Sequence, residues 1–288
     1  MPARQVKQLI RAIDTSDGAG VKLRRSLGQS AGARLDPLLM LDEFYSDEPA
    51  DYLAGFPSHP HRGFETVTYI LDGHMLHEDH LGNKGDLKSG GVQWMRAGRG
   101  IIHSEMPQQN QGRMRGFQLW INLPATEKMQ APWYRDLPAD QIPHYPTPHG
   151  GEIKLIAGEL TLANKLLSGA LTQHEGKTLS TAPIYADLRL AAGETLQLAT
   201  PAHHNAVIYV YEGEATIGSK LVPEAHAAVL GEGDTLELSA RQGAVQALFI
   251  AGRPINEPIV QYGPFVMNSS EEIEQTLQDY RDGRLALP

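Results

Sequence analysis

The sequence of 288 residues contains no cysteine, which excludes disulfide bonds and thiolate metal ligands. It has no apolar run near the roughly 18 residues of a membrane span, and residues 1–14 hold no run long enough for the core of a signal peptide. Basic residues are outnumbered, with 25 Lys and Arg against 34 Asp and Glu. We therefore expect a cytoplasmic protein that binds neither membranes nor nucleic acids directly.

Long helical patterns are also missing from the first 150 residues, where short apolar runs alternate with glycine-containing turns. The run Phe64–Leu71 is rich in β-branched and aromatic residues and ends at Asp72-Gly73, a pair typical of tight hairpin turns. The return strand is expected over His74–His80. This texture predicts an all-β barrel or sandwich fold.

A helix is predicted only near the end of the chain. Ser269 stands three residues before Glu272, which is the spacing of a capping box. Apolar residues recur with helical spacing from Ile273 to Tyr280, and Gly283 stands where a helix commonly ends. We expect this helix to cover an apolar patch on a barrel.

The chain is expected to form two domains, residues 1–145 and 146–288. The stretch 144–151 is rich in Pro and Gly and lies near the midpoint, so it is the best candidate for a linker. An internal repeat supports this division, because aligning residue 72 with residue 212 matches three apolar strand positions. The matched residues are Val67, Tyr69 and Ile70 with Val207, Tyr209 and Val210.

Two short phrases in the first copy of the repeat carry potential metal ligands, His59-Pro60-His61 and His103-Ser104-Glu105. Side chains at i and i+2 project from the same face of a strand. Two such pairs facing each other inside a barrel would supply three imidazoles and one carboxylate, a donor set suited to a divalent transition metal. The second copy has apolar residues at the aligned positions, so only the first barrel is expected to be chemically active. These residues are Ala199, Pro201, Leu236 and Leu238.

Three further groups each admit two interpretations. A histidine-rich arm is expected to be a hydrophilic hairpin and not a second metal site, because His77 takes the opposite face from His74 and His80. An aromatic and sulfur group is expected in the barrel core and not as a ligand platform: Trp94, Met95 and Trp120. Three arginines either orient an anionic substrate or form salt bridges: Arg62, Arg96 and Arg99.

Residues 55–73 and 91–103 resemble the two motifs of the cupin fold, and longer strings within 56–69, 92–107 and 256–268 resemble the pirin family. The resemblance runs over nearly the whole chain. It implies two cupin barrels in tandem, each a double-stranded β-helix or jelly roll, followed by a C-terminal α-helix. It also implies one mononuclear metal, held in the N-terminal barrel of residues 1–145.

By this resemblance the metal ligands are His59, His61, His103 and Glu105. In the general cupin pattern the carboxylate ligand would instead be Glu65. We favour Glu105 and expect Glu65 beside the ligands or in the pocket, together with Phe56 and Arg62. The family usually holds iron, so Fe(2+) is expected, although the same donors accept Mn, Ni, Cu or Zn.

The resemblance further implies a quercetin 2,3-dioxygenase. Such an enzyme uses a metal and dioxygen to open the heterocycle of a flavonol or a related small aromatic enol. Glu105 is the expected catalytic base, accepting the proton of the flavonol 3-hydroxyl. The alternative is a metal-binding regulatory protein that acts through protein partners, and turnover of a flavonol discriminates between the two.

Overall fold

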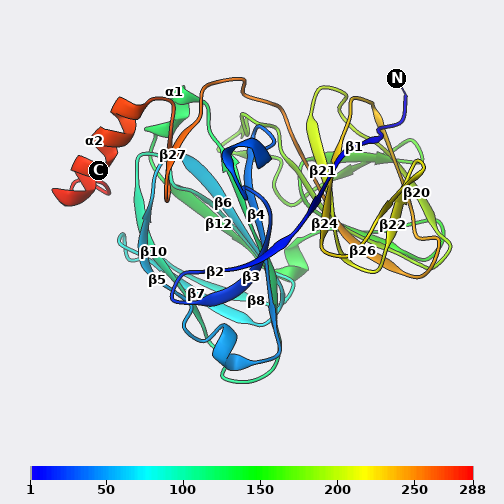
Figure 1. Cartoon of the computed structure of the whole chain (residues 1–288), viewed down its shortest axis with the longest axis horizontal. Helices are drawn as coiled ribbons and strands as arrows, with labels where there is room; N and C mark the ends of the chain where they lie inside the picture. Colours follow the sequence, from blue (N-terminus) through cyan, green and yellow to red (C-terminus); the bar gives the residue numbers. More distant parts are fainter. Residues whose placement is uncertain (1, 288) are drawn as a thin grey trace. The chain divides into compact units, whose positions relative to one another are not determined.

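The computed structural model describes residues 2–287 and separates the chain into two compact units (Figure 1). Neither unit is a continuous stretch of sequence. The first barrel comprises Asp14–Arg25, Leu38–Ala139 and Ile255–Pro288, and the second barrel comprises Met1–Ile13, Ser26–Pro37 and Asp140–Pro254. Both are built from β-sheets, and the α-helices are the short α1 (Ala125–Lys128) and α2 (Ser270–Arg281). The expected all-β class with two barrels and a C-terminal helix is confirmed.

The first barrel contains a seven-stranded sheet in the order β12-β9-β6-β11-β4-β3-β2 and a four-stranded sheet in the order β5-β10-β7-β8. Buried side chains from both sheets share one core, in which Ile70 and Met114 pack with Met75 and Leu87. The larger sheet consists of β2 (Ile13–Asp17), β3 (Val21–Leu27), β4 (Leu38–Ser46), β6 (Phe64–Asp72), β9 (Val92–Arg96), β11 (Met114–Asn122) and β12 (Trp133–Leu137). The smaller sheet consists of β5 (Phe56–His61), β7 (His74–Asp79), β8 (Lys84–Lys88) and β10 (Ile101–Pro107).

The second barrel repeats this plan. Its seven-stranded sheet has the order β1-β24-β21-β26-β19-β14-β13, and its six-stranded sheet has the order β16-β15-β20-β25-β22-β23. The larger sheet consists of β1 (Val6–Arg11), β13 (His144–Pro146), β14 (Glu152–Ala157), β19 (Ile184–Leu190), β21 (Asn205–Glu212), β24 (His226–Leu230) and β26 (Val245–Gly252). The other strands are β15 (Glu159–Leu162), β16 (Lys165–Ser168), β20 (Thr195–Ala199), β22 (Ala215–Ile217), β23 (Lys220–Val222) and β25 (Thr235–Ser239), with a two-stranded pair β17 (Gln173–His174) and β18 (Lys177–Thr178).

The predicted hairpin at Asp72-Gly73 is wrong, although both flanking strands exist. Strand β6 pairs with β9 and β11, whereas β7 pairs with β8 and β10 in the other sheet. Gly73 has a φ of +121°, while Asp72 is not among the residues of positive φ, so the type I′ geometry that joins paired strands is not formed. The turn therefore carries the chain from one sheet to the other.

The structure contains the predicted repeat, but the predicted alignment of β5 with β20 is shifted by one residue. His59 lies opposite His103 in the first barrel, and the equivalent cross-strand pair in the second barrel is Leu198 with Leu236. Leu198 is buried, whereas the predicted counterpart Ala199 is exposed. With this shift the counterparts of His59, His61 and His103 are Leu198, Thr200 and Leu236, so the second barrel has no imidazole at these positions. The expected apolar character holds at Leu198, Leu236 and Leu238, but Thr200 is a buried polar residue that accepts a hydrogen bond from Arg4.

The ends of the chain cross over between the units, unlike the expected division at residues 145 and 146. Strand β1 pairs with β24, so the beginning of the chain completes a sheet of the second barrel. The expected linker 144–151 is not a linker, because β13 pairs with β14 inside that same sheet. Long-range strand pairing decides both assignments.

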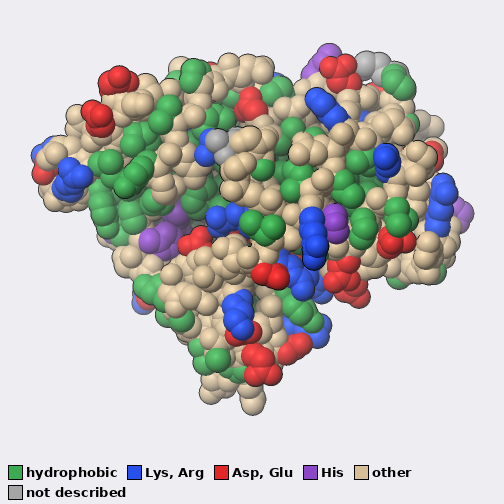
Figure 2. Space-filling view, in the orientation of Figure 1, with side chains coloured by type: hydrophobic (Ala, Val, Ile, Leu, Met, Phe, Trp, Pro, Cys, Tyr) green, Lys and Arg blue, Asp and Glu red, His purple; other side chains and the backbone are tan. Residues whose placement is uncertain are grey.

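The C-terminal segment of the first barrel contains β27 (Val260–Tyr262), β28 (Phe265–Met267) and helix α2. The capping box between Ser269 and Glu272 is present, and Gly283 follows the helix with a φ of +69°, as predicted. Ile273 packs with Phe265 in a small apolar cluster, and hydrophobic side chains gather on the visible face where α2 and β27 lie (Figure 2). Within residues 2–287, no helix has the length and apolar character needed to span a membrane.

Candidate metal centre

Three histidines meet in the smaller sheet of the first barrel. His59 and His61 lie on β5, and His103 lies on the neighbouring antiparallel strand β10, directly opposite His59. One donor atom from each ring lies within 4.8 Å of the other two. The ring of His103 has its centroid 4.3 Å from that of His59 and 4.9 Å from that of His61. The alternation of side chains along two paired strands thus produces the predicted cluster.

Each histidine of the cluster has one ring nitrogen that could bind a cation. Nδ1 of His59 donates to the carbonyl of Pro57 over 2.8 Å, which leaves the lone pair on its Nε2. That Nε2 lies 3.0 Å from Nε2 of His61. Nε2 of His103 is buried and has no hydrogen-bond partner in the described chain. Buried nitrogens without a partner are costly, and a divalent metal bound between the three rings would satisfy them.

Burial keeps two of these imidazoles neutral. His61 and His103 are only 3% and 2% exposed, and this loss of solvent lowers the pKa of each ring well below its usual value. The neighbouring histidines lower both pKa values further, because a second positive charge in the cluster is repelled. Neutral imidazole is the form that binds metals. His59 is half-buried and so lies on the solvent side of the cluster.

Aromatic side chains line one side of the cluster. His61 meets Phe64 edge-on at 5.1 Å between ring centroids and Trp120 at 5.4 Å. Trp94 and Met95 are buried, as predicted for core residues. Trp120 differs from that prediction, because it is half-buried and stands against a histidine of the candidate centre.

Glu105 points inward on the same strand as His103, but its carboxylate is hydrogen-bonded to Thr68 and does not join the cluster of donor atoms. The side chain is 6% exposed, and its Oε1 accepts a hydrogen bond from Oγ1 of Thr68 over 3.0 Å. Within residues 2–287, the cluster of donor atoms comprises the three histidines and does not extend to this carboxylate. Its role as a fourth ligand stays a prediction.

The other predicted site residues have their own partners. Glu65 accepts hydrogen bonds from Arg96 Nε at 2.8 Å and from Trp94 Nε1 at 3.1 Å, so its carboxylate belongs to a buried ion pair. Phe56 lies opposite Glu105 on β5 and packs against the barrel core.

Arg62 follows His61 directly but contacts the C-terminal segment instead of a pocket. Its guanidinium donates to Asp279 at 2.8 Å and to the carbonyl of Leu285 at 3.1 Å. The salt-bridge interpretation therefore holds for both Arg62 and Arg96.

His77 was not predicted from the sequence to be near the ligands. Strand alternation correctly separates its side chain from His74 and His80, but it does not show that the separate face is the inner one. His77 is 2% exposed, its Nδ1 lies 3.1 Å from Nδ1 of His103, and its ring meets Tyr134 at 5.6 Å between centroids. The spacing of His74, His77 and His80 was the signal in the sequence that could have singled out His77, because it places this residue on the face opposite the other two.

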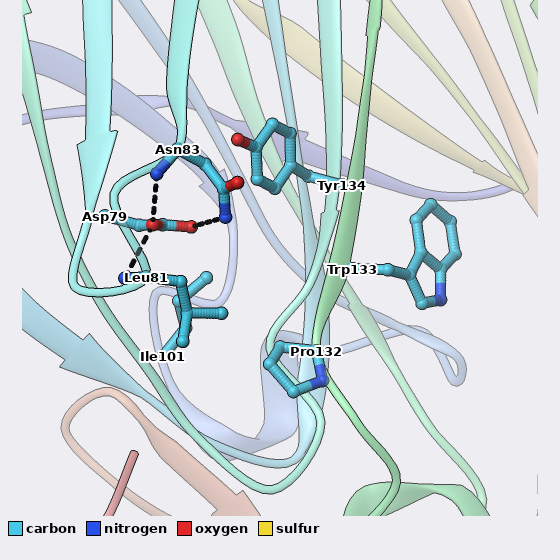
Figure 3. A pocket seen from close by; sticks show the side chains of 7 residues that line it. All are labelled: Asp79, Leu81, Asn83, Ile101, Pro132, Trp133 and Tyr134. Atoms are coloured by element: carbon cyan, nitrogen blue, oxygen red, sulfur yellow. Dashed lines mark hydrogen bonds between the residues drawn. The ribbon is translucent and has the colours of Figure 1, made fainter. Parts of the chain in front are cut away.

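A cavity of about 280 Å³ lies between the 79–83 loop and the start of β12, and Tyr134 is one of the residues that line it. Asp79 shapes the loop by accepting hydrogen bonds from the backbone of Leu81 and from both nitrogens of Asn83 (Figure 3). Tyr134 lines this cavity and also meets the ring of His77, and burial raises the pKa of its hydroxyl to about 12, so the phenol stays protonated.

Comparison with known proteins covers both barrels. Residues 20–121 match the family model Pirin, and residues 185–286 match the model of the pirin C-terminal cupin domain. A Pseudomonas aeruginosa protein named "Putative quercetin 2,3-dioxygenase" is 52% identical over 287 residues, which is 99% of each chain. Human pirin is 38% identical, over 98% of this chain and 94% of its own.

Solved structures agree on the fold. A quercetin 2,3-dioxygenase from Acinetobacter baumannii has a TM-score of 0.87 and 30% identity over 99% of both chains. A bacterial pirin from Escherichia coli in complex with nickel(II) has a TM-score of 0.61 and 20% identity, over 86% of this chain and 98% of its own. The second likeness shows a shared fold alone.

Proposed function

The chain belongs to the pirin family, and on this premise we propose that it is a metal-dependent dioxygenase that opens the heterocycle of flavonols such as quercetin. The overall reaction adds both atoms of dioxygen to the flavonol and releases carbon monoxide. The observation that carries the proposal is the convergence of three imidazoles, from His59, His61 and His103, in the first barrel, whereas the second barrel has no histidine at the equivalent positions.

The three histidines hold the metal, and Fe(2+) is the ion we propose. A bound divalent ion supplies Lewis acidity and, when it is iron, one-electron chemistry with dioxygen. Three imidazoles leave coordination positions open for substrate. Burial of His61 and His103 excludes water from the inner side of the centre, while half-buried His59 marks the side open to solvent.

Glu105 is the proposed base. Its carboxylate lies on the same strand face as His103, two residues along β10, and accepts the proton of the flavonol 3-hydroxyl. Thr68 donates a hydrogen bond to Oε1 of this carboxylate, which fixes the group while leaving its second oxygen for the proton or for metal ligation. The aromatic rings of Phe64 and Trp120 beside His61 suit an aromatic substrate.

The test is turnover of quercetin by the full chain reconstituted with Fe(2+). We expect loss of quercetin absorbance under air, with oxygen uptake and release of carbon monoxide, and no such change for His103→Ala. The proposal fails if metal-loaded wild-type protein and His103→Ala leave quercetin equally unchanged. Stoichiometric metal binding without turnover, together with a protein that co-purifies specifically, would instead support the regulatory alternative.

A further inference from the structure

His77 lies at the metal centre without belonging to the three-histidine cluster. It stands opposite Glu105 on the neighbouring strand, and its ring centroid is 4.8 Å from that of His103. The two other histidines of the same strand region point outward, since His74 pairs with Asp86 and His80 contacts the carbonyl of Ala286. His77 is therefore the inward histidine of this arm.

The contact between His77 and His103 joins two ring nitrogens, Nδ1 to Nδ1, over 3.1 Å. Such a contact is a hydrogen bond only when one nitrogen carries a proton and the other carries a lone pair. If His77 were the donor, neutral His103 would carry its own proton on Nε2 and could not bind a metal there. If His103 is the donor, its buried Nε2 has the lone pair and becomes the ligand atom.

His59 provides an independent parallel within the same centre. Its Nδ1 donates to a backbone carbonyl, that of Pro57, which leaves Nε2 as the ligand atom. Two histidines of the cluster thus have their outer nitrogen in a hydrogen bond that selects the Nε2 lone pair. Ligand histidines in proteins are usually oriented by a partner of this kind, most often a carboxylate or a carbonyl.

We infer that His77 is a positioning residue whose Nδ1 accepts the Nδ1–H of His103, fixing the tautomer and the ring orientation in which His103 binds the metal. This inference rests on the proposed metal centre but not on the dioxygenase reaction. Tyr134 packs on His77 and holds the accepting ring in place. Because β7 and β10 are paired, the two rings are carried by adjacent strands of one sheet.

The first experiment measures the dissociation constant of Zn²⁺ by chelator competition in the full chain. His77→Phe keeps an aromatic ring but removes the acceptor, and we expect binding to weaken by roughly 10- to 100-fold. His77→Gln keeps an acceptor oxygen and should restore most of this loss. His74→Phe, on the same strand but partly exposed, is the matched control and should bind as wild type does.

The second experiment reads the tautomer directly in wild-type protein labelled with ¹⁵N-histidine, so it does not depend on whether a variant folds. Two-bond ¹H–¹⁵N correlation should show His103 protonated on Nδ1, both metal-free and with Zn²⁺ on Nε2. A His103 protonated on Nε2 in the metal-free protein, or a His77→Phe variant that binds zinc as tightly as wild type, overturns the inference. Wild-type protein that binds zinc through the expected tautomer but leaves quercetin unchanged when reconstituted with Fe(2+) overturns the dioxygenase proposal alone.

Discussion

Nε of Arg96 donates to Oε1 of Glu65 over 2.8 Å, between directly opposed residues of β9 and β6. Trp94 donates to the other oxygen of the same carboxylate, and Glu127 makes a second ion pair with Arg96. Burial raises the pKa of Glu65, while the arginine beside it acts in the opposite direction. Glu65, the residue that the general cupin pattern assigns to the metal, is therefore engaged in a buried ion pair between two strands of the larger sheet.

Breaking this pair is expected to destabilise the first barrel strongly. Arg96→Met leaves a buried carboxylate without its cation, and we expect a loss of about 3–5 kcal/mol in the free energy of unfolding. The double variant Glu65→Gln/Arg96→Met should lose clearly less than the sum of the two single variants, because the fully buried Glu65 charge is no longer left unpaired. Urea unfolding measures all three. Additive losses would show that the pair is energetically uncoupled.

Lys128 is expected to be essential for stability although it lies on the short helix α1. Its Nζ donates to the carbonyls of Gly63 and Val266, at 2.7 and 3.0 Å, and to Oδ1 of Asn122 at 2.6 Å. Lys128→Met strands three acceptors in the interior and should cost at least about 3 kcal/mol. Exposed Lys165→Met is the control and should lie within about 0.5 kcal/mol of wild type by chemical denaturation. Equal stability of the two variants would contradict this account.

Arg62 is expected to anchor helix α2 to the end of strand β5 and so to stabilise the first barrel. Its buried pair with Asp279 holds the helix next to the residue that follows His61. Arg62→Met should lower the unfolding free energy by about 3 kcal/mol or more, because Asp279 loses its buried partner. The control is Arg284→Met, whose half-exposed pair with Asp282 should contribute less than about 1 kcal/mol. A smaller loss for Arg62→Met than for the control would refute the coupling.

The stability of the second barrel is expected to depend on pH through His204. Burial, followed by the charges of Arg253 and Arg4, lowers the pKa of this imidazole from 6.5 to about 4. Above pH 6.5 the ring is neutral in both the folded and the unfolded state, so it has no effect. As the pH falls from 6.5 to 4, the imidazole becomes protonated in the unfolded chain but stays neutral in the folded chain. The free energy of unfolding therefore decreases over this range. Solvent screening limits the total to about 2 kcal/mol.

His204→Gln should remove this component of the pH dependence, and denaturant unfolding at several pH values between 4 and 7 measures it. His226→Gln is the control, since that residue is more exposed and contacts only a backbone carbonyl two residues away. An unchanged pH profile for His204→Gln would rule out the assignment.

Glu105 and Thr68 are expected to affect turnover unequally. Glu105→Gln removes the proposed base and should reduce kcat on quercetin by roughly 100-fold or more, in line with general base catalysis. Thr68→Val leaves the carboxylate in place but removes its hydrogen bond to Oε1, together with the contact between Thr68 and Gln118, and should cause a smaller loss. Steady-state kinetics on protein of measured iron content separates these effects from metal loss. Comparable kcat for Glu105→Gln and wild type would exclude the carboxylate as base.

Local features of the fold and site could be predicted from the sequence. The pairs His59/His61 and His103/Glu105 each share a strand face because alternation is a property of the strand itself. The cap of α2 lies in four consecutive residues, so the sequence also predicts where that helix begins. Both depend on neighbours in the chain and on no distant contact.

Features that depend on distant pairing could not be predicted in this way. Whether β7 follows β6 in one sheet or crosses to another is decided by β10, which lies far along the chain. The same pairing decides that His77 faces inward and contacts His103. The pairing of β1 with β24 likewise joins segments more than 200 residues apart, and no local pattern encodes it.

The crossing of the chain ends has a consequence for biosynthesis. The first barrel includes residues 255–288, and Val266 accepts a hydrogen bond from Lys128 beside the turn that follows His61. Domains that are continuous in sequence can fold on the ribosome as they emerge, the N-terminal one first. Here the three histidines of the candidate centre lie within the first 103 residues, but β27, β28 and α2, which belong to the same unit, follow the second barrel in the sequence. The first unit can therefore be completed only after the second barrel has been synthesised.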